Sequence, residues 1–453
     1  MAVRILLFFM LFITSLTAQV STVSPFSSQG IGDVNFYGDA YFVGLGGSTV
    51  SVIDSSQANL FNPASYAFTA RGLPIFSMGL AHEETTFLLG EQRGNDRFTN
   101  ITHFSLIIPF GKRWGMSMGL KPLSRSGYEI NSFQIIGGDS IFYRFSGKGE
   151  IQKANLGLSL LMANSLNHKL AMGVNGFRYF GRLERERKAF QKNALGGESG
   201  GLERQFLRAK DFGFDAGLVY QYSPSNKHLL TIGGTYQMEQ NVQFTKSSFD
   251  MYFGEINNPQ TFDTLSPLSN FDGSITFPQK IKVGMTYEYK TQRDTVSLRG
   301  SKRSSSLLFT AEYGLEDWST YSEDFAGITA VPVNFFDVTS LRFGMQYRPH
   351  RYIAERSDFV KTMSKWSYRI GGYMVETPNR LNEDQVQDMG VTMGIGIPIV
   401  LSNAVSSINI SASYGQRGVS LEADSYRERY LGINFGINIV PTYDKWFRKY
   451  ELN

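Results

Sequence analysis

Apolar and polar residues alternate one by one along most of this chain. In Lys280–Lys290, one face carries isoleucine, valine, methionine and tyrosine, and the other carries lysine, glycine, threonine and glutamate. The same alternation is present in Asp211–Tyr220, Ser407–Tyr414 and Leu431–Ile439. A period of two is the signature of a β-strand with two unlike faces. The pattern therefore predicts an all-β protein.

The alternating segments predict about 14 strands, an even number within the range of closed membrane barrels. They lie at Leu73–Ala81, Ile101–Phe110, Trp114–Glu129, Ile141–Leu161, Lys169–Phe180, Phe206–Tyr222, Leu229–Thr245, Gln279–Lys290, Leu307–Leu315, Ser340–Arg348, Trp366–Val375, Asp388–Ile399, Ser406–Gln416 and Tyr430–Val440.

The segments between the strands predict short turns that alternate with long loops. Phe110–Trp114 and Tyr222–Leu229 have the length of tight turns, and Gly181–Gln205 and Lys246–Phe277 have the composition of long polar loops. The charged run Arg182–Lys188 is interpreted as a solvated strand extension or loop. Short turns on one side and long loops on the other are typical of outer-membrane barrels, with both termini on the periplasmic side.

Two further links, Thr291–Ser306 and Pro349–Lys365, are long for turns on the periplasmic side. They fit this arrangement least well.

Composition favours a barrel in lipid over a soluble β-sandwich, which also alternates. Aromatic residues recur toward the predicted strand ends, and glycine and small polar residues dominate the second face; the chain has 46 Gly, 36 Phe and 23 Tyr. Aromatic residues at strand ends form girdles at the two membrane interfaces, and small polar side chains suit a crowded barrel interior. A sheet that spans a membrane must close on itself, because lipid offers no hydrogen-bond partners. We therefore expect a closed antiparallel transmembrane β-barrel.

The N-terminus predicts a secretory signal peptide over residues 1–18. Arg4 precedes the apolar run Ile5–Ile13, and small residues follow up to Ala18. This run is shorter than the roughly 20 apolar residues of a membrane-spanning helix. The chain contains no cysteine, so we expect neither a lipid-modified cysteine nor a disulfide.

The segment between the signal peptide and the first strand does not alternate. It contains the glycine-rich stretch Gly44–Gly47 and, further on, Asn62-Pro63-Ala64. We expect residues 19–72 to form a hatch that plugs the lumen of a barrel over residues 73–440, with a periplasmic tail over 441–453. The glycines accompany no strand–loop–helix unit of a nucleotide site, and tight packing against the barrel wall explains them better.

These motifs resemble the FadL-type long-chain fatty-acid transporters. Gly38–Gly47 followed by Ala58–Ala64 is similar to the glycine-rich stretch and Asn-Pro-Ala box that precede the first strand in that family. Phe277–Gly284 and Ala311–Ser319 are similar to two of its later motifs. A final set of blocks resembles a Bacteroidetes-type version of the family: Gly390–Pro398, Tyr414–Gly418 and Asp444–Lys449.

The resemblance implies a 14-stranded barrel with an N-terminal hatch and a path for a hydrophobic ligand that opens sideways into the membrane. The hatch residues Gly44, Gly46, Gly47, Asn62, Pro63 and Ala64 would then have structural or gating roles. Ser65 stands where the family usually has glycine, and no ligand-pocket residues of the family can be matched.

Candidate chemistry is sparse. Asp211, Asp215 and Glu312 are predicted to face the lumen, Glu312 with a polar contact to the hatch. The five histidines are scattered, so we expect no metal site. His103 and Ser105 share a face, but no third orienting group accompanies them, so we expect that the protein is not an enzyme. No cofactor is expected.

We expect an outer-membrane protein, embedded among outer-membrane lipids, that takes up a hydrophobic small molecule similar to a fatty acid. The alternative is a barrel that binds a protein partner in a type IX secretion complex or another outer-membrane complex. A hydrolase active at the barrel rim is a third hypothesis. The net charge of +4 is small and scattered, and it favours no nucleic-acid partner.

Overall fold

The computed structural model describes residues 22–34, 38–70, 73–137, 139–192, 197–254, 262–293, 303–326, 334–349, 366–401, 404–419 and 425–441. The expected signal peptide lies outside these residues, as does all but the first residue of the expected tail.

The described chain folds into one antiparallel sheet that closes on itself. Its elements are η1 (Pro25–Ser28), α2 (Ala40–Val43), η2 (Pro63–Phe68), β1 (Ile75–Leu89), β2 (Gln92–Phe110), β3 (Trp114–Ile136), β4 (Asp139–Asn164), β5 (His168–Lys192), β6 (Glu198–Ala209), β7 (Phe212–Ser225), β8 (His228–Gln237), β9 (Gln240–Phe253), β10 (Phe262–Phe277), β11 (Lys280–Arg293), β12 (Arg303–Glu316), η4 (Trp318–Thr320), β13 (Ser322–Phe325), β14 (Val338–Arg348), β15 (Ser367–Leu381), β16 (Asp384–Leu401), β17 (Ala404–Gly418) and β18 (Arg427–Ile439).

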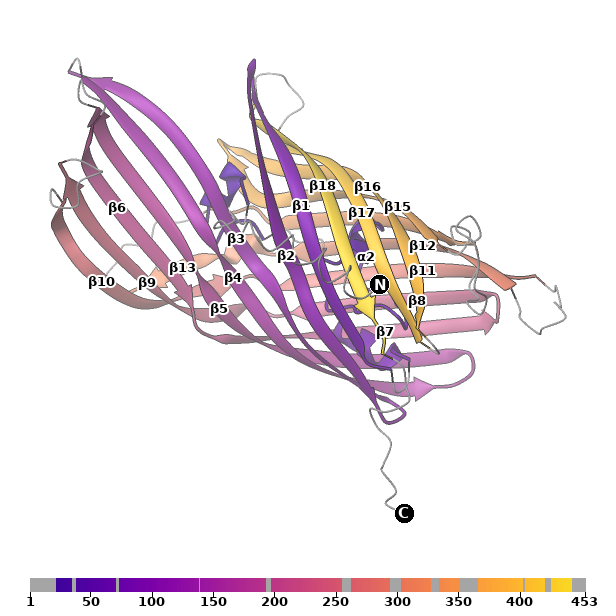
Figure 1. The fold of residues 1–453 in the computed structure, drawn as a ribbon. Helices are drawn as coiled ribbons and strands as arrows, with labels where there is room; N and C mark the ends of the chain where they lie inside the picture. Colours follow the sequence, from indigo (N-terminus) through magenta and orange to yellow (C-terminus); the bar gives the residue numbers. More distant parts are fainter. Residues whose placement is uncertain are drawn as a thin grey trace, which may run out of the picture.

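The closed ring has 14 strands, which confirms the prediction. It runs β1-β2-β3-β4-β5-β7-β8-β11-β12-β14-β15-β16-β17-β18, and β18 pairs with β1 from Phe76↔Ile439 to Leu88↔Arg427. The other four strands continue ring strands past a break. β6 extends β7, β9 extends β8, β10 extends β11, and β13 follows β12; β6 pairs with β9, and β10 pairs with both β9 and β13. Figure 1 shows this wall of the barrel extending to the upper left.

The expected long loops Gly181–Gln205 and Lys246–Phe277 are wrong, because most of each range is strand. β5 continues to Lys192, β6 starts at Glu198, and β9 and β10 occupy most of the second range. Beyond the bilayer both faces of a strand meet water, so the apolar–polar alternation fades and charged residues replace it. The charged run Arg182–Lys188 is accordingly a strand extension, paired with both β4 and β6.

The strands are far longer than a membrane requires. β3, β4 and β5 contain 23, 26 and 25 residues, whereas roughly 9–11 tilted residues cross a bilayer. The short turns Gly111–Arg113 and Ser165–Asn167 lie at one end of the barrel, which we call the turn end. The extensions lie at the opposite end, which we call the extended end. The links Thr291–Ser306 and Pro349–Lys365 leave from the turn end and lie largely outside the described residues.

The barrel is apolar outside and polar inside, the reverse of a soluble sandwich. Large apolar side chains that are more than a third exposed occur on strands all round the ring, among them Met118, Leu156, Val174, Phe214, Met285, Phe343, Ile370, Met393 and Ile433. Polar side chains of the same strands are buried inside, among them Ser117, Asn155, Asn175, Thr286, Glu312, Gln346, Asn409 and Asn438. At the turn end, Phe110 stacks on Trp114 with ring centroids 6.1 Å apart. No helix among the described residues is long and apolar enough to cross a membrane.

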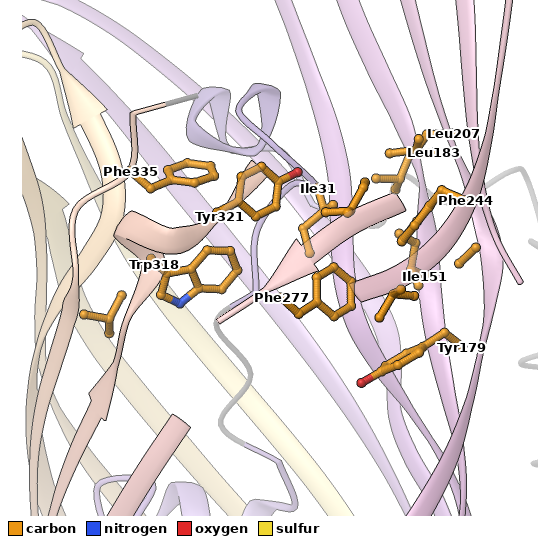
Figure 2. Packing of buried hydrophobic residues seen from close by; sticks show 14 of the residues in the cluster. Ile31, Ile151, Tyr179, Leu183, Leu207, Phe244, Phe277, Trp318, Tyr321 and Phe335 are labelled. Atoms are coloured by element: carbon orange, nitrogen blue, oxygen red, sulfur yellow. The ribbon is translucent and has the colours of Figure 1, made fainter. Parts of the chain in front are cut away.

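An aromatic cluster fills the bend of the extended wall, where the ring strands break. Trp318 and Tyr321, at and just after η4, pack with Phe335, with ring centroids 5.9 Å apart or less. Figure 2 shows Ile31 of the N-terminal segment between these rings and Phe277 of β10. The break at Pro278–Gln279 follows from proline, which cannot donate to a central ladder.

The described N-terminal segment, residues 22–34 and 38–70, lies inside the barrel. Its backbone approaches the wall at a stripe of glycines: Gly46 has a positive φ of 70°, and a Cβ on Gly371 of β15 would lie 2.2 Å from the Gly46 nitrogen. Likewise, a Cβ on Gly344 of β14 would lie 2.6 Å from the Leu45 carbonyl oxygen, and Gly44 faces Gly394 of β16. The glycine-rich stretch therefore permits direct contact between two backbones.

Replacing Gly371 by alanine is expected to destabilise the barrel, because the new methyl group has no space against the Gly46 backbone. Overpacking of this kind costs about 1–3 kcal/mol of the free energy of unfolding. The adjacent Gly372 is the matched control, since its Cβ would lie 3.5 Å from the nearest atom. Thermal unfolding in detergent, followed by the mobility shift of the folded barrel on a gel, measures both variants. Equal midpoints for G371A and G372A would contradict the contact.

Candidate functional site: the barrel lumen

The Asn62-Pro63-Ala64 motif joins the N-terminal segment to strand β7. Asn62 precedes η2, and its Oδ1 accepts a hydrogen bond from the Ala64 backbone at 3.0 Å. Its Nδ2 donates to the Val50 carbonyl at 2.6 Å and to the Leu218 carbonyl of β7 at 3.3 Å. Asn62 and Ala64 are fully buried. The geometry gives the motif a structural role, as an N-cap that also holds the wall.

Glu312 of β12 receives the backbone of the same segment. One carboxylate oxygen accepts from the backbone nitrogens of Thr49 and Val50, at 2.6 and 2.9 Å. Glu312 is 3% exposed. Hydrogen bonds to an ionised acceptor are roughly twice as strong as neutral ones. The carboxylate thus supplies an acceptor for two buried N–H groups that would otherwise have none.

A second polar contact joins the segment to β14 and β15. Asp54 forms a buried ion pair with Arg348, and Arg348 also donates to the Tyr41 hydroxyl at 3.3 Å. The Arg369 guanidinium lies 4.2 Å from the centre of the Tyr41 ring. Burial works against the charged form of Asp54, but Arg348 and hydrogen bonds from Ser56 hold the pKa of Asp54 well below its ordinary value. The ion pair with Arg348 therefore favours the charged form of Asp54 inside the barrel.

The start of the segment is bound near the extended end. Arg417 of β17 pairs with Asp33 at 2.9 Å and with Asp388 of β16 at 3.2 Å. Ser24 donates to Glu428 of β18 at 2.8 Å. The segment thus meets charged groups on strands at several heights of the wall.

The two aspartates predicted to share a lumen face have different surroundings. Asp215 of β7 accepts a hydrogen bond from Asn175 at 2.8 Å and is close enough to Lys153 for their charges to interact. Asp211 instead lies at the break between β6 and β7, where its carboxylate accepts from the Gln243 backbone at 2.8 Å. Asp211 accepts a backbone hydrogen bond at the bend. Of the two aspartates, Asp215 is the one that lies near the buried lysines of the lumen.

Three cavities lie in sequence along β1, β2 and β3. The outermost has a volume of about 750 Å³ and lies between the β1–β2 hairpin and β3 to β5. The second, about 80 Å³, shares Val23 with the first. The third, about 140 Å³, shares Gly38 and Thr102 with the second. Because adjacent cavities share lining residues, they lie next to one another in a row beside the N-terminal segment.

The third cavity, which we call the lysine chamber, gathers cations from three strands. Lys121 and Lys153 belong to β3 and β4, and Lys280 and Lys282 belong to β11. Glu316 pairs with the β11 lysines at 2.6 and 3.6 Å. Asp39 also lines the chamber, and Asp215 lies close enough to Lys121 and Lys153 for their charges to interact, so four lysines face three carboxyl groups.

The lysine chamber also has apolar walls. Leu60, Phe61 and Leu123 line it. Lys121 lies 4.5 Å from the centre of the Phe61 ring, and Lys153 lies 4.2 Å from that of Phe177. Phe177 belongs to the same buried hydrophobic cluster as Ile31 and Phe277. A surplus of cations beside an apolar wall suits a molecule with an anionic end and an apolar body.

Sequence reasoning missed this chamber. The lysines lie singly in different strands, and β-barrel closure alone brings them together. The only available signal was the position of Lys280 and Lys282 on the polar face of their strand.

The remaining candidates for chemistry have other partners. The His103 ring nitrogens contact the hydroxyls of Ser77 at 2.8 Å and Thr102 at 3.1 Å, and Ser105 is not among its partners. Among the described residues, no group of three or more histidine, aspartate or glutamate side chains is arranged to hold a metal ion.

The family model described as BamG matches residues 1–453 of this chain. That name differs from the FadL-type family that the motifs resemble. No curated protein matches the chain.

Solved structures with the same fold include three outer-membrane barrels. The toluene transporter TbuX of Ralstonia pickettii is 13% identical, with 89% of this chain and 98% of that chain covered and a TM-score of 0.51. A FadL homologue of Pseudomonas aeruginosa is 14% identical, with 93% and 99% covered and a TM-score of 0.53. The toluene transporter TodX of P. putida is 16% identical, with 90% and 98% covered and a TM-score of 0.53. At these identities the likeness to the FadL family is one of fold.

Replacing Glu312 by alanine is expected to loosen the N-terminal segment, because two buried N–H groups lose their acceptor. A buried unsatisfied donor costs about 1–3 kcal/mol. E312Q retains an acceptor oxygen without the charge and is expected to have a smaller effect. Single-channel recording in planar bilayers measures the change as more frequent and larger openings in E312A than in the wild type. Unchanged conductance in E312A would show that this contact does not hold the segment in place.

Proposed function

This chain belongs to the BamG family, and from its geometry we propose that it is an outer-membrane barrel that takes up a small amphipathic molecule, similar to a fatty acid, from outside the cell. The observation that carries the proposal is the row of three cavities that ends in the lysine chamber. The toluene transporters and the FadL homologue of the same fold support passage of an apolar molecule. The lysines of the chamber add the expectation that one end of this molecule is anionic.

The proposed orientation places the turn end in the periplasm and the extended end outside the cell. β1 starts and β18 ends at the turn end, where Phe76 pairs with Ile439. Short periplasmic turns are the rule for outer-membrane barrels. Both ends of the barrel chain would then face the periplasm, and the 750 Å³ cavity would be the outer mouth.

A break in the wall supplies a sideways route for an apolar body. β2 and β3 pair only from Phe104↔Leu120 to Phe110↔Trp114, although both strands continue well beyond. Above this point β2 pairs with β1 alone, and β3 pairs with β4. Figure 1 shows β1 and β2 diverging from β3 toward the top. The side chain of Arg125 bridges the start of the gap by donating to the Ile101 carbonyl at 2.9 Å.

Neutralising Lys153 is expected to weaken binding of an anionic amphiphile but not of its uncharged analogue. The probes are dodecanoate and dodecanol, measured by native mass spectrometry of the purified barrel in mild detergent. We expect wild-type protein to prefer dodecanoate, and K153Q to lose about tenfold in dodecanoate affinity, which is about 1.4 kcal/mol.

K227Q is the matched control, because Lys227 lies exposed in the turn between β7 and β8. Equal binding of dodecanoate and dodecanol by wild-type protein would overturn the proposal that the ligand has an anionic end. Binding of neither would overturn the uptake function.

A second candidate function is binding of a protein partner in an outer-membrane complex. The specific observation is the extended wall, since strands of 23 to 26 residues reach far beyond the bilayer. Purification from native outer membranes in mild detergent is expected to retain a partner in a fixed ratio. Recovery of the barrel alone would remove this candidate and leave the uptake function unaffected.

A further inference from the structure

The gap between β2 and β3 leaves two unpaired strand edges that differ in character. The β2 edge at the extended end carries Arg93, Asp96 and Arg97. Charged side chains protect an exposed edge against pairing with another strand. The β3 edge ends instead in Phe133-Gln-Ile135-Ile136. Phe133 and Ile135 are 68% and 66% exposed. One edge is protected, and its neighbour across the gap is open.

Contacts at the lower end of β3 show which of its residues point their backbone N–H and C=O groups toward the unpaired edge. Asp33 forms a bridge with Arg125, with hydrogen bonds of 2.7 and 2.9 Å, so the N–H and C=O of Arg125 point away from β4. Two residues on, the N–H of Gly127 donates to the Ser27 hydroxyl at 3.1 Å. Orientation alternates along a strand, so the four odd-numbered residues that follow present their backbone to the same edge. They are Glu129, Asn131, Phe133 and Ile135.

These four residues have no backbone partner across the edge in the part of the chain that the structure describes. A groove of about 750 Å³ runs beside the edge and is bounded across the gap by Phe87, Leu88 and Leu89 of β1. The lower edge already accepts strand-type pairing from Asp33. The groove therefore continues an interaction that another segment makes lower on the same edge.

We propose that the edge of β3 from Glu129 to Ile135 receives an extended strand of a partner protein by β-augmentation. The partner strand supplies backbone hydrogen bonds to the four odd-numbered residues. It also carries apolar side chains at alternate positions, which pack on Phe133, Ile135 and the β1 side of the groove. This inference rests on the second candidate function, for which it defines the surface. The partner strand would lie in the cavity proposed as the outer mouth, so it would also limit the entry of a ligand there.

The test is amide hydrogen exchange, resolved to single residues, on the full-length protein in isolated native outer membranes and on the full-length folded protein after any bound partner has been stripped from it. The amides of Glu129, Asn131, Phe133 and Ile135 are expected to exchange at least tenfold more slowly in the membranes. The amides of the even-numbered residues Ile130, Ser132 and Gln134, which face β4, are expected to be protected in both samples. Fast exchange of the odd-numbered amides in both samples would overturn the proposal, as would slow exchange in both.

The variant for the test is N131P, because proline at an edge-facing position removes one free donor without removing a bond to β4. It is expected to abolish the protection of the odd-numbered amides in native membranes and to leave the even-numbered amides protected. Photo-cross-linking from a benzoylphenylalanine at position 133 then identifies the occupant. Cross-linked peptides from an alternating strand of another protein support the proposal, and peptides from this chain itself overturn it. If a partner co-purifies but the odd-numbered amides of β3 are not protected, the second candidate function stands and the β3 edge is not its binding surface.

Discussion

The structure depends on one constraint: a sheet that crosses lipid must pair every backbone group and turn its apolar side chains outward. Closure of 14 strands satisfies the backbone. It also collects the opposite faces of all the strands in one enclosed space, where serine, threonine, asparagine and charged side chains meet. Those groups need partners, since a buried polar group without one costs about 1–3 kcal/mol. The N-terminal segment supplies them, through contacts such as Glu312 with Thr49 and Val50 and Asp54 with Arg348.

The same constraint explains where the barrel departs from regularity. Where β2 and β3 separate, lipid cannot satisfy the freed groups, and the protein does so itself. Arg125 donates to the Ile101 carbonyl, Asp33 pairs with Arg125, and Ser27 contacts Gly127. Above these contacts the β3 edge has no backbone partner among the described residues, at a height where water or another protein can reach it. The gap is thus closed by the segment low in the wall and open high in the wall.

Much of the fold could be predicted from the sequence, because the strands of a barrel all repeat the same apolar–polar alternation. Alternation located all 14 ring strands, and the glycines at 44 and 46 and the Asn62-Pro63 pair marked backbone that touches the wall. Two long ranges were wrongly predicted as loops, because a strand with water on both faces loses its apolar side. The lysine chamber could not be predicted from the sequence, for a different reason. Its cations lie far apart in the chain, and only the register of the closed ring brings Lys153 and Lys280 together.

The strength of these contacts also indicates how a ligand would pass. Displacing the whole N-terminal segment would separate the Asp54–Arg348 pair and leave two buried charges without partners, at a cost of about 3–5 kcal/mol for such a pair. It would also remove the acceptor of two N–H groups at Glu312 and open the glycine contact at Gly371. These contacts are made by Arg348, Glu312 and Gly371, none of which lines the three cavities. Passage beside the segment, with small shifts near Gly38 and Thr102, breaks none of them. The position of the cavities therefore favours a segment that stays in place while the ligand moves past it.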